Sequence, residues 1–477
     1  MESGTKLDRF AAHRWFPAVV WTLRLVVGAL FVMSGLVKGI DLWGFVFKLE
    51  EYLAVWGFSE PRSITVIGAL LISGYEFVFG LLLATGCYKR VSVWALLLQM
   101  AVMLPLTLYI AVAEPVSDCG CFGDFWVISN TMTFVKNLLI TAALVALLIL
   151  NPRLKQGMFQ PAIQWIAGTW ISLYFIIVAL YGYNVQPMVD FRPYPVGTPL
   201  IGADAGEAFA EEDADAEPMV FVYERDGQKQ EFTMDNLPDS TWTFVERIGE
   251  SPADDAGGHA EGAAFTVYDE SGEDVTEEAI TTAGREFLVV IPEPQRIDIS
   301  YTYFLNELKE WADSSDVGMV ALIAAGRREI DFIKDISMAS YDIYSAEDTK
   351  LKELARGTMS LVELEDGRIK AKYTLSSIKG DIIDAGPSGA DLPERMAPRP
   401  QWWFKALTGF FAACLLGLYL FQSLILAINS RIRALYQKKR VNLQSENAGA
   451  ASGAVSEDKK HNHNKLENNH EKEHRSR

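Results

Sequence analysis

Long apolar runs alternate with shorter polar segments along the chain. The six runs lie roughly at Pro17–Val37, Ile64–Thr85, Val91–Ala113, Val127–Leu150, Ala162–Tyr183 and Phe404–Ile428. Each has about 20 residues or more, enough for a helix to cross the roughly 30 Å of hydrocarbon in a bilayer. A compact soluble domain could not bury six such runs. The pattern therefore predicts an α-helical membrane protein with six transmembrane helices.

The basic residues indicate how these helices are oriented. If every run spans the membrane, all of the segments rich in Lys and Arg fall on one side. They contain Lys6, Arg9, Arg14, Lys89, Arg90, Arg153, Lys155, Arg431, Arg433, Lys438, Lys439 and Arg440. Positively charged loops remain in the cytoplasm, so the N-terminus and the C-terminus are predicted to be cytoplasmic. The predicted location is the bacterial inner (cytoplasmic) membrane, with the segment between the fifth and sixth runs in the periplasm, on the extracytoplasmic side.

That segment has the pattern of a soluble domain. Much of the acidity lies here, and the whole chain has a formal net charge of -18. Without a basic stripe to neutralise phosphates, nucleic acid is not expected as a partner. A hairpin is predicted to turn at Asp226-Gly227, and a flexible loop is predicted at residues 250–264. From Glu286 onward, strand and helix patterns alternate and end in a hairpin at Asp366-Gly367, which predicts a small α/β sandwich.

The polar tail after Arg440 has too few apolar residues to form a core, so it is predicted to be disordered. Four of the histidines lie in it: His461, His463, His470 and His474. A His-rich tail can bind metal weakly, but a solvated tail is favoured and no metal site is predicted. The other two histidines are His13, before the first run, and His259, in the flexible loop, and neither position predicts a histidine-ligated haem or a Ser-His-Asp triad.

The strongest signal for chemistry is DCGCFGD, residues 118–124, between the third and fourth runs. Cys119 and Cys121 are predicted to lie on the oxidising side of the membrane, where disulfides persist. A bridge between residues two apart closes a small strained ring, and strain makes a disulfide easier to exchange. The alternatives are a zinc ion held with the two flanking carboxylates, or cysteines that only pack or form one inert bridge. Cys87 and Cys414 are predicted to be small apolar fillers.

Several charged or polar side chains lie within the predicted spans, where an ionisable group is a candidate for function. Arg24 and Glu76 are each about 10–14 Å from the cytoplasmic edge of their runs and are predicted to pair, for structure or for function. Lys38 and Lys136, which is followed by Asn137, are predicted near the depth of the Cys-Gly-Cys loop. They could lower a thiol pKa, bind an anionic headgroup, or only snorkel to the surface. Lys136 joins the two cysteines as a candidate catalytic residue.

Three segments of the first 150 residues resemble one family of small membrane proteins. They are RLVVGALFVMSGLVKGID (24–41), YEFVFGLLL around Glu76, and DCGCFGD followed by FVKN (134–137). Together they resemble the DoxX/MauE superfamily of four-helix membrane proteins over roughly residues 17–150. The resemblance implies a four-helix bundle with a redox association. That association is with disulfide formation in exported proteins, or with thiol and quinone chemistry, so quinone is a candidate cofactor.

The second half of the outer domain resembles a thioredoxin fold. FLVVIPEP resembles the central strand of that fold, and MSLVELEDGRI resembles the strand pair that leads from its active-site proline. The chemistry departs from the pattern, because residues 292–295 (PEPQ) stand where a Cys-x-x-Cys motif is expected. Thr358-Met359 stands near the place of the usual proline. The resemblance implies a thioredoxin-like fold without thiol chemistry, and a binding or docking role.

These patterns divide the chain into six predicted regions. They are a four-helix DoxX/MauE-like membrane domain at 1–151, a fifth transmembrane helix at 152–184, an acidic linker and β-rich subdomain at 185–279, a thioredoxin-like extracytoplasmic domain at 280–400, a sixth transmembrane helix at 401–430 and a disordered cytoplasmic tail at 431–477. The predicted function is redox-associated: Cys119 and Cys121 exchange thiol/disulfide electrons with an exported protein or with quinone. The alternative is a non-enzymatic scaffold, embedded in membrane lipids, that recruits an envelope partner through its outer domain. A transporter is disfavoured, since no repeat or broken helix pair is evident.

Overall fold

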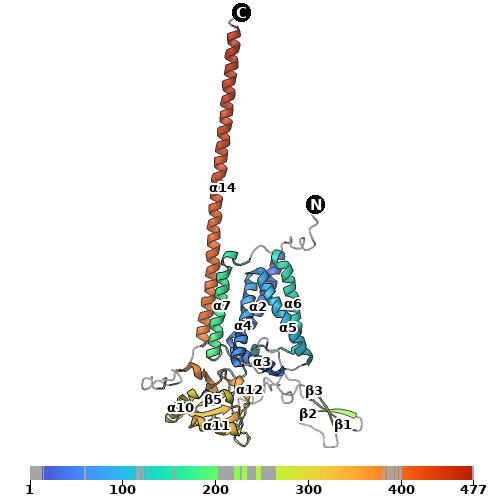
Figure 1. The fold of residues 1–477 in the computed structure, drawn as a ribbon, viewed down its shortest axis with the longest axis vertical. Helices are drawn as coiled ribbons and strands as arrows, with labels where there is room; N and C mark the ends of the chain where they lie inside the picture. The colour runs from blue at the N-terminus through green and yellow to red at the C-terminus, as the bar shows by residue number, and fades with distance from the viewer. Residues whose placement is uncertain are drawn as a thin grey trace. The chain divides into compact units, whose positions relative to one another are not determined.

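The computed structural model describes residues 13, 15–58, 61–113, 116, 120, 123–126, 128–153, 157–201, 220–225, 228–233, 243–248, 265–378, 382–383, 392, 396 and 400–474. The chain divides into two compact units, Met1–Phe411 and Ala412–Arg477, and each is described by itself. The first unit contains a bundle of apolar helices and a mixed α/β domain (Figure 1). The second unit is helical.

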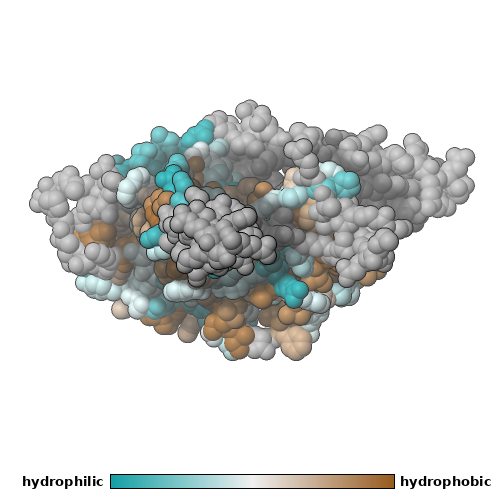
Figure 2. Space-filling model, turned by 90° about the horizontal axis from the view of Figure 1, so that it is seen from above, coloured by the Kyte–Doolittle hydropathy of each residue, from teal (hydrophilic) through white to brown (hydrophobic). Residues whose placement is uncertain are grey.

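Among the described residues, six helices are long and apolar enough to cross a membrane, which confirms the predicted helical membrane protein. They are α2 (Phe16–Ile40), α4 (Arg62–Thr85), α5 (Lys89–Ala113), α6 (Asn130–Leu150), α7 (Gln164–Asn184) and α14 (Pro400–His474). Within α14, the apolar part is Trp402–Arg440. Large apolar side chains such as Leu71, Leu98 and Leu139 are exposed on these helices, and brown apolar atoms lie at the surface in Figure 2. Hydrocarbon covers such faces in a membrane protein.

Small residues bring α2 and α4 into close contact. A Cβ atom at Gly35 would lie 2.5 Å from the backbone nitrogen of Phe77, and one at Gly28 would lie 2.8 Å from the Cβ atom of Ala84. In lipid, helices gain little from apolar contact alone, so small residues stabilise a helix pair by allowing close packing. These contacts also set the register: α2 is shifted along its axis relative to α4, and its C-terminal end is level with the middle of α4.

A helix that the sequence did not predict, α3 (Leu42–Val55), follows α2 directly. Asp41 caps its first turn, because the carboxylate accepts a hydrogen bond from the backbone N–H of Gly44 at 3.0 Å. The helix buries an apolar side and also carries charged residues, among them Lys48 and Glu50. At 14 residues it is too short to span the bilayer.

The α/β domain is built on a six-stranded mixed sheet in the order β4-β7-β6-β5-β8-β9. Its strands are β4 (Val267–Tyr268), β5 (Arg285–Ile291), β6 (Gly318–Ile323), β7 (Asp342–Ala346), β8 (Ser360–Glu365) and β9 (Arg368–Thr374). β5, β6 and β7 run parallel, whereas β8 is antiparallel to β5 and β9 is antiparallel to β8. The β8–β9 hairpin turns at Asp366-Gly367, as predicted, with φ values of 50° and 72° that suit a tight hairpin turn.

Helices cover both faces of this sheet. α10 (Thr302–Ser314) and α11 (Arg327–Ser337) pack on one face, and α12 (Asp348–Leu354) packs on the other. The central strand β5 is almost wholly buried because both of its faces are covered. A mixed sheet with parallel central strands, helices on both faces and a final antiparallel hairpin is compatible with the predicted thioredoxin-like fold.

A separate three-stranded antiparallel sheet has the order β2-β1-β3. Its strands are β1 (Val220–Arg225), β2 (Gln228–Thr233) and β3 (Thr243–Ile248). β1 and β2 pair in register, which confirms the predicted hairpin. Its turn at Asp226-Gly227 and the loop predicted at residues 250–264 lie outside the described residues.

The second unit consists of the rest of α14, which continues as one helix to His474. In the structure the helix extends as far as residue 474, whereas the sequence predicts a disordered tail at 431–477. Residues 431–474 contain no proline and many good helix formers such as Ala, Glu and Lys. In the described part of the chain, no His, Cys, Asp and Glu side chains gather as a metal site.

Candidate functional site

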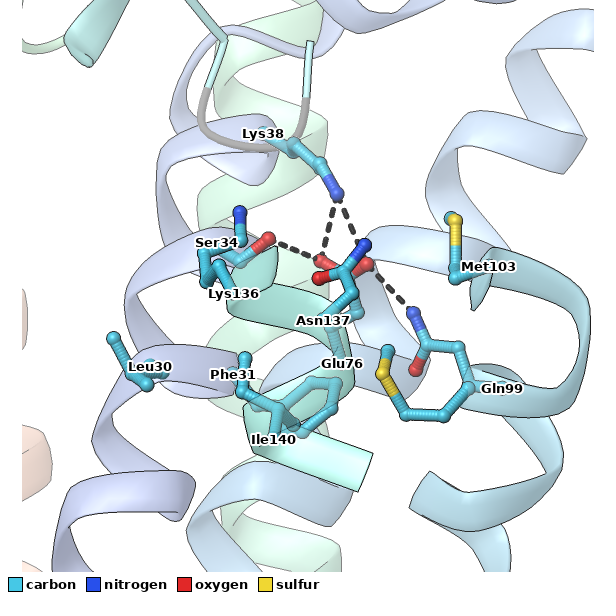
Figure 3. A pocket seen from close by; sticks show the side chains of 11 residues that line it. Leu30, Phe31, Ser34, Lys38, Glu76, Gln99, Met103, Lys136, Asn137 and Ile140 are labelled. Carbon is cyan, nitrogen blue, oxygen red and sulfur yellow. Dashed lines mark hydrogen bonds and ion pairs between the residues drawn. The ribbon is translucent and has the colours of Figure 1, made fainter. Parts of the chain in front are cut away.

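A buried ion pair joins α2 to α4 inside the helical bundle (Figure 3). The ammonium of Lys38 donates to both carboxylate oxygens of Glu76, at 2.9 Å to Oε1 and 2.8 Å to Oε2. Ser34 of α2 donates to Oε2 at 2.7 Å, and the side-chain amide of Gln99 on α5 donates to Oε1 at 2.7 Å. One carboxylate therefore ties three helices together.

Burial and hydrogen bonds hold this pair in place. The side chains of Lys38 and Glu76 are only 2% and 5% exposed, so bulk water solvates neither of them. The ammonium also lies 4.8 Å from the centroid of the Phe45 ring, within the range of a cation–π contact. The pair is thus a fixed and electrically neutral element of the bundle, and removing one partner would leave an uncompensated buried charge.

A small cavity lies beside this ion pair, where α2, α4, α5 and α6 meet. Its polar lining consists of Ser34, Lys38, Glu76, Gln99, Lys136 and Asn137 (Figure 3). The cavity volume is about 40 Å³. One water molecule needs roughly 10–15 Å³, and a cavity that binds benzene has about 150 Å³. The cavity therefore has room for a few water molecules and not for an aromatic ring.

The cavity brings together four of the residues that the sequence singled out: Lys38, Glu76, Lys136 and Asn137. Asn137 is buried and donates a hydrogen bond to the hydroxyl of Thr107 at 3.4 Å. Lys136 is half-buried at the cavity.

Two further residues of the site, Ser34 and Gln99, were not predicted, because uncharged polar residues are common in membrane helices. One signal could have found Gln99, since it is the only side-chain amide in the third apolar run.

The predicted pair between Arg24 and Glu76 is wrong. Arg24 is fully buried near the other end of α2, where it donates to the side-chain oxygen of Asn151 and lies 5.0 Å from the Trp21 ring. The prediction counted depth from the end of each apolar run and assumed that the helices are level. Because α2 and α4 are staggered, Arg24 lies beside Gly86, beyond the end of α4, and Lys38 takes its place at Glu76.

The two cysteines of the candidate redox loop, Cys119 and Cys121, lie outside the described residues. The glycine between them is described: Gly120 has a φ of +60°, and a Cβ atom there would lie 2.7 Å from Cγ of Lys48. Glycine suits both the left-handed backbone and the close contact. The short helix η1 (Gly123–Phe125) that follows contacts α2 and α3. Gly120 therefore contacts α3, and η1 contacts both α2 and α3.

The lysine whose side chain contacts this loop is Lys48 of α3. Its ammonium also pairs with Glu51 at 2.9 Å. Lys38, which the sequence suggested for lowering a thiol pKa, is instead held by Glu76. Lys48 was missed because α3 is neither a span nor part of the soluble domain, so no sequence pattern predicted an ordered helix beside the loop.

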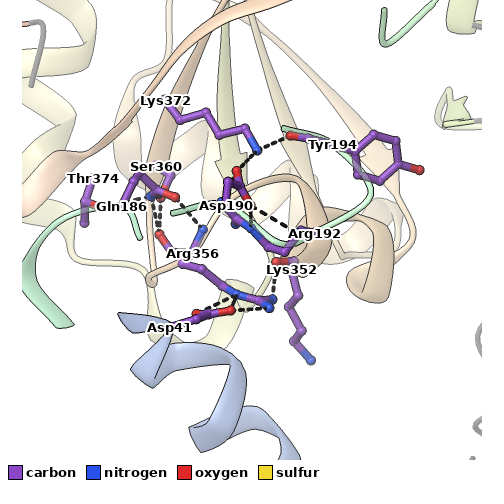
Figure 4. A network of polar contacts seen from close by, with 10 residues as sticks. All are labelled: Asp41, Gln186, Asp190, Arg192, Tyr194, Lys352, Arg356, Ser360, Lys372 and Thr374. Atoms are coloured by element: carbon purple, nitrogen blue, oxygen red, sulfur yellow. Dashed lines mark hydrogen bonds and ion pairs between the residues drawn. The ribbon is translucent and has the colours of Figure 1, made fainter. Parts of the chain in front are cut away.

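The α/β domain is joined to the membrane helices by further buried ion pairs (Figure 4). The Nε atom of Arg356, which follows α12, donates to the two carboxylate oxygens of Asp41 at 3.1 and 3.0 Å, and its Nη2 atom donates at 2.8 Å. Burial acts to raise the pKa of Asp41, but the Arg356 guanidinium outweighs it and holds that pKa below its ordinary value. Gln186, just after α7, binds the backbone N–H and C=O of Arg356 at 3.0 and 2.7 Å. Several directional contacts therefore fix the domain at this point.

Other ion pairs add to these contacts, one of them between the α/β domain and a membrane helix and one between the domain and the linker. Arg62, at the start of α4, is bound by Glu50 of α3 at 2.6 Å and by Glu293 at 2.5 Å. Glu293 lies in the loop after β5, where thioredoxin-like folds carry their cysteines, so this loop docks on the helices instead. Lys372 of β9 binds Asp190 of the linker at 2.9 Å. Burial acts to raise the pKa of Asp190, but a neighbouring arginine and Lys372 hold it well below its usual range.

The fold and the site together define a class of protein. It is a multi-pass membrane protein in which α2, α4, α5 and α6 enclose a lysine–glutamate pair and a docked α/β domain follows. Residues 16–150 match the family described as methylamine utilisation protein MauE. This part of the chain is therefore a membrane domain of the MauE/DoxX type, as the sequence resemblance indicated. Residues 218–250, which include β1, β2 and β3, match a domain of unknown function (DUF8463).

A curated relative, Protein TlpB of Flavobacterium psychrophilum, is 24% identical over 194 residues. The alignment covers 40% of this chain and 52% of the relative, so the chain spans about half of the relative's length. No solved structure is significantly similar to the chain. The comparisons support a MauE-type membrane protein.

Proposed function

We propose that the chain is a redox-associated membrane protein in which Cys119 and Cys121 exchange electrons with an exported thiol protein. The observation that carries the proposal is the position of Gly120, between the two cysteines, against Lys48 at the end of a MauE-type bundle. The Lys48 ammonium is paired with Glu51, and we propose that it exchanges this partner for a loop thiolate, the reactive form, which a nearby cation stabilises. The loop is thus a suitable site for thiol–disulfide exchange.

In the proposed reaction, a thiolate of the exported protein attacks the Cys119–Cys121 disulfide, and a mixed disulfide forms. The second thiol of the exported protein then attacks that mixed bond. The exported protein leaves as a disulfide, and both loop cysteines become thiols, so two electrons and two protons have passed to the loop.

A quinone dissolved in the bilayer is the proposed acceptor that returns the loop to the disulfide. It takes up the two electrons and two protons and becomes a quinol. Because the cavity of about 40 Å³ beside Glu76 is too small for an aromatic ring, the quinone would meet the loop outside that cavity. Lys136, which lines the cavity, would then act on the loop only through its charge.

A second candidate function, a membrane scaffold, is favoured by a different observation. The α/β domain is fixed to the helices through Asp41 and Arg356, and residues 185–400 contain no cysteine. A firmly docked domain without thiols suits the recruitment of an envelope protein better than redox chemistry. The two functions are compatible if the domain recruits the protein that the loop oxidises.

A variant without the resolving cysteine tests the redox proposal. In Cys121→Ser, the Cys119 thiolate can still attack the disulfide of the oxidised exported protein, which reverses the last step, and the resulting mixed disulfide has no second loop thiol to resolve it. Cells quenched with acid should then contain higher-mass species that disappear on reduction. The matched control carries Ser at both positions and should contain none. If neither single variant traps a mixed disulfide and the double variant assembles its partner normally, the scaffold function is the one that remains.

A further inference from the structure

Four large aromatic side chains are exposed near the loop, at the end of the bundle that carries α3. Trp56 and Phe58, which follow α3, are 49% and 58% exposed. Phe125, at the end of η1, and the next residue, Trp126, are 45% and 54% exposed. The first pair stands just before α4 and the second just before α6. Both pairs are therefore placed where a membrane helix meets the bilayer surface.

The turn that displays Trp56 and Phe58 has a defined conformation. Gly57 has a φ of +73°, its N–H binds the carbonyl of Ala54 at 3.0 Å, and the N–H of Phe58 binds the carbonyl of Leu53 at 2.8 Å. This is a Schellman turn, in which a left-handed glycine closes the helix. The two aromatic side chains are thus held outward by an ordered backbone and not by a frayed helix end.

The membrane helices that follow the two aromatic pairs along the chain expose apolar side chains. On α4, Ile64, Ile67 and Leu71 are exposed at intervals of three and four residues, which places them along one side of the helix. On α6, Met132 and Leu139 are exposed two turns apart. In a membrane protein these faces contact lipid tails. Lipid already covers the neighbouring surface, so it is the occupant that the aromatic side chains fit best.

We propose that Trp56, Phe58, Phe125 and Trp126 bind lipid at the level of the headgroups. Tryptophan prefers this depth because its ring is apolar while its N–H can still be hydrogen-bonded. The proposal concerns four described side chains and does not require the redox function.

The lipid contact has a consequence for the loop. Gly120 packs against Lys48 of α3, the helix whose end carries the first aromatic pair. With the aromatic side chains at headgroup level, Gly120 lies close to the membrane surface. Thiol reagents that partition into the bilayer should then react with Cys119 and Cys121 faster than charged reagents of the same reactivity.

The test measures the depth of single labelled positions in lipid nanodiscs. The background is the full chain with all four native cysteines replaced by Ala or Ser. Phe58→Cys and Trp126→Cys are each labelled with a fluorophore, and quenching is compared between lipids that are spin-labelled near the headgroup and near the chain end. Leu71→Cys, in the middle of a span, and Ser271→Cys, on an exposed turn of the α/β domain, are the matched controls.

The expected result is strong quenching of both test positions by the headgroup-level spin label and weaker quenching by the deep one. Leu71→Cys should show the reverse order, and Ser271→Cys should show little quenching by either. Test positions that behave like Ser271→Cys overturn the proposal. Fluorescence that depends on protein concentration and not on the spin-labelled lipids also overturns it, because a second copy of the chain would then cover the surface.

Discussion

The Lys38–Glu76 pair allows the sharpest perturbation of the candidate site. Glu76 accepts two hydrogen bonds from Lys38 and one each from Ser34 and Gln99. Lys38→Met would leave a buried carboxylate with only the two neutral donors. Loss of one partner of a buried pair lowers the free energy of unfolding by about 3–5 kcal/mol. Glu76→Leu should cost a similar amount, because it leaves the ammonium beside the Phe45 ring without a counter-ion.

The double variant, with Lys38→Met and Glu76→Leu together, separates a structural role from a functional one. Both charges are gone, and apolar side chains of similar volume replace them. Such replacements range from neutral to stabilising by about 1–4 kcal/mol. The double variant should therefore be more stable than either single variant by about 3 kcal/mol or more. It should nevertheless be inactive if the pair has a functional role, because the cavity has lost its ion pair.

Unfolding in nanodiscs, followed by tryptophan fluorescence, measures the stability of each variant, and assembly of the exported partner in cells measures function. Leu71→Met, which changes only a lipid-facing side chain, is the control and should match the natural chain. Single variants as stable as the natural chain would refute the reasoning about a buried charge pair. A double variant that is both stable and active would show that the pair has a structural role alone.

Three other changes follow from the structure, and a fourth tests the topology that the basic residues predict. Gly35→Val should lower the free energy of unfolding by about 1–3 kcal/mol, because α2 and α4 must move apart to make room for the side chain. Thermal unfolding measures this change. Arg356→Ala should lower the free energy of unfolding by about 3–5 kcal/mol, because Asp41 loses its buried ion-pair partner. Limited proteolysis between the domains should be faster in Arg356→Ala than in Arg356→Lys. Burial raises the pKa of Glu286 from 4.5 to about 7, so the folded state binds the extra proton in that range. Stability should therefore fall as pH rises from 4.5 to about 7, and Glu286→Gln should abolish this dependence in unfolding curves. Gln156→Cys should resist a membrane-impermeant thiol reagent in intact cells if its loop is cytoplasmic.

The sequence predicted the elements whose signal is local. A membrane span needs only length and apolar composition, so all six were found with approximately correct ends. The two hairpins were found because Asp-Gly between alternating residues is a strong turn signal. Strand and helix order also predicted an α/β domain, since parallel strands need helical crossovers.

The sequence could not predict features that depend on how the elements pack. The stagger between α2 and α4 comes from close contacts such as that of Gly35 with Phe77, and it decides that Glu76 meets Lys38 and not Arg24. The contact between Asp41 and Arg356 joins residues 315 positions apart, for which one sequence contains no spacing rule.

The most direct test of the redox proposal is the cycle of Cys119 and Cys121 in living cells. A chain with Cys87→Ala and Cys414→Ala is exposed to a pulse of reductant and returned to growth medium. Samples are quenched with acid at intervals, and free thiols are tagged with a mass label. Both cysteines should be labelled after the pulse, and the label should be lost with time as the disulfide re-forms. A cysteine pair that is labelled to the same extent at every interval would contradict the redox proposal.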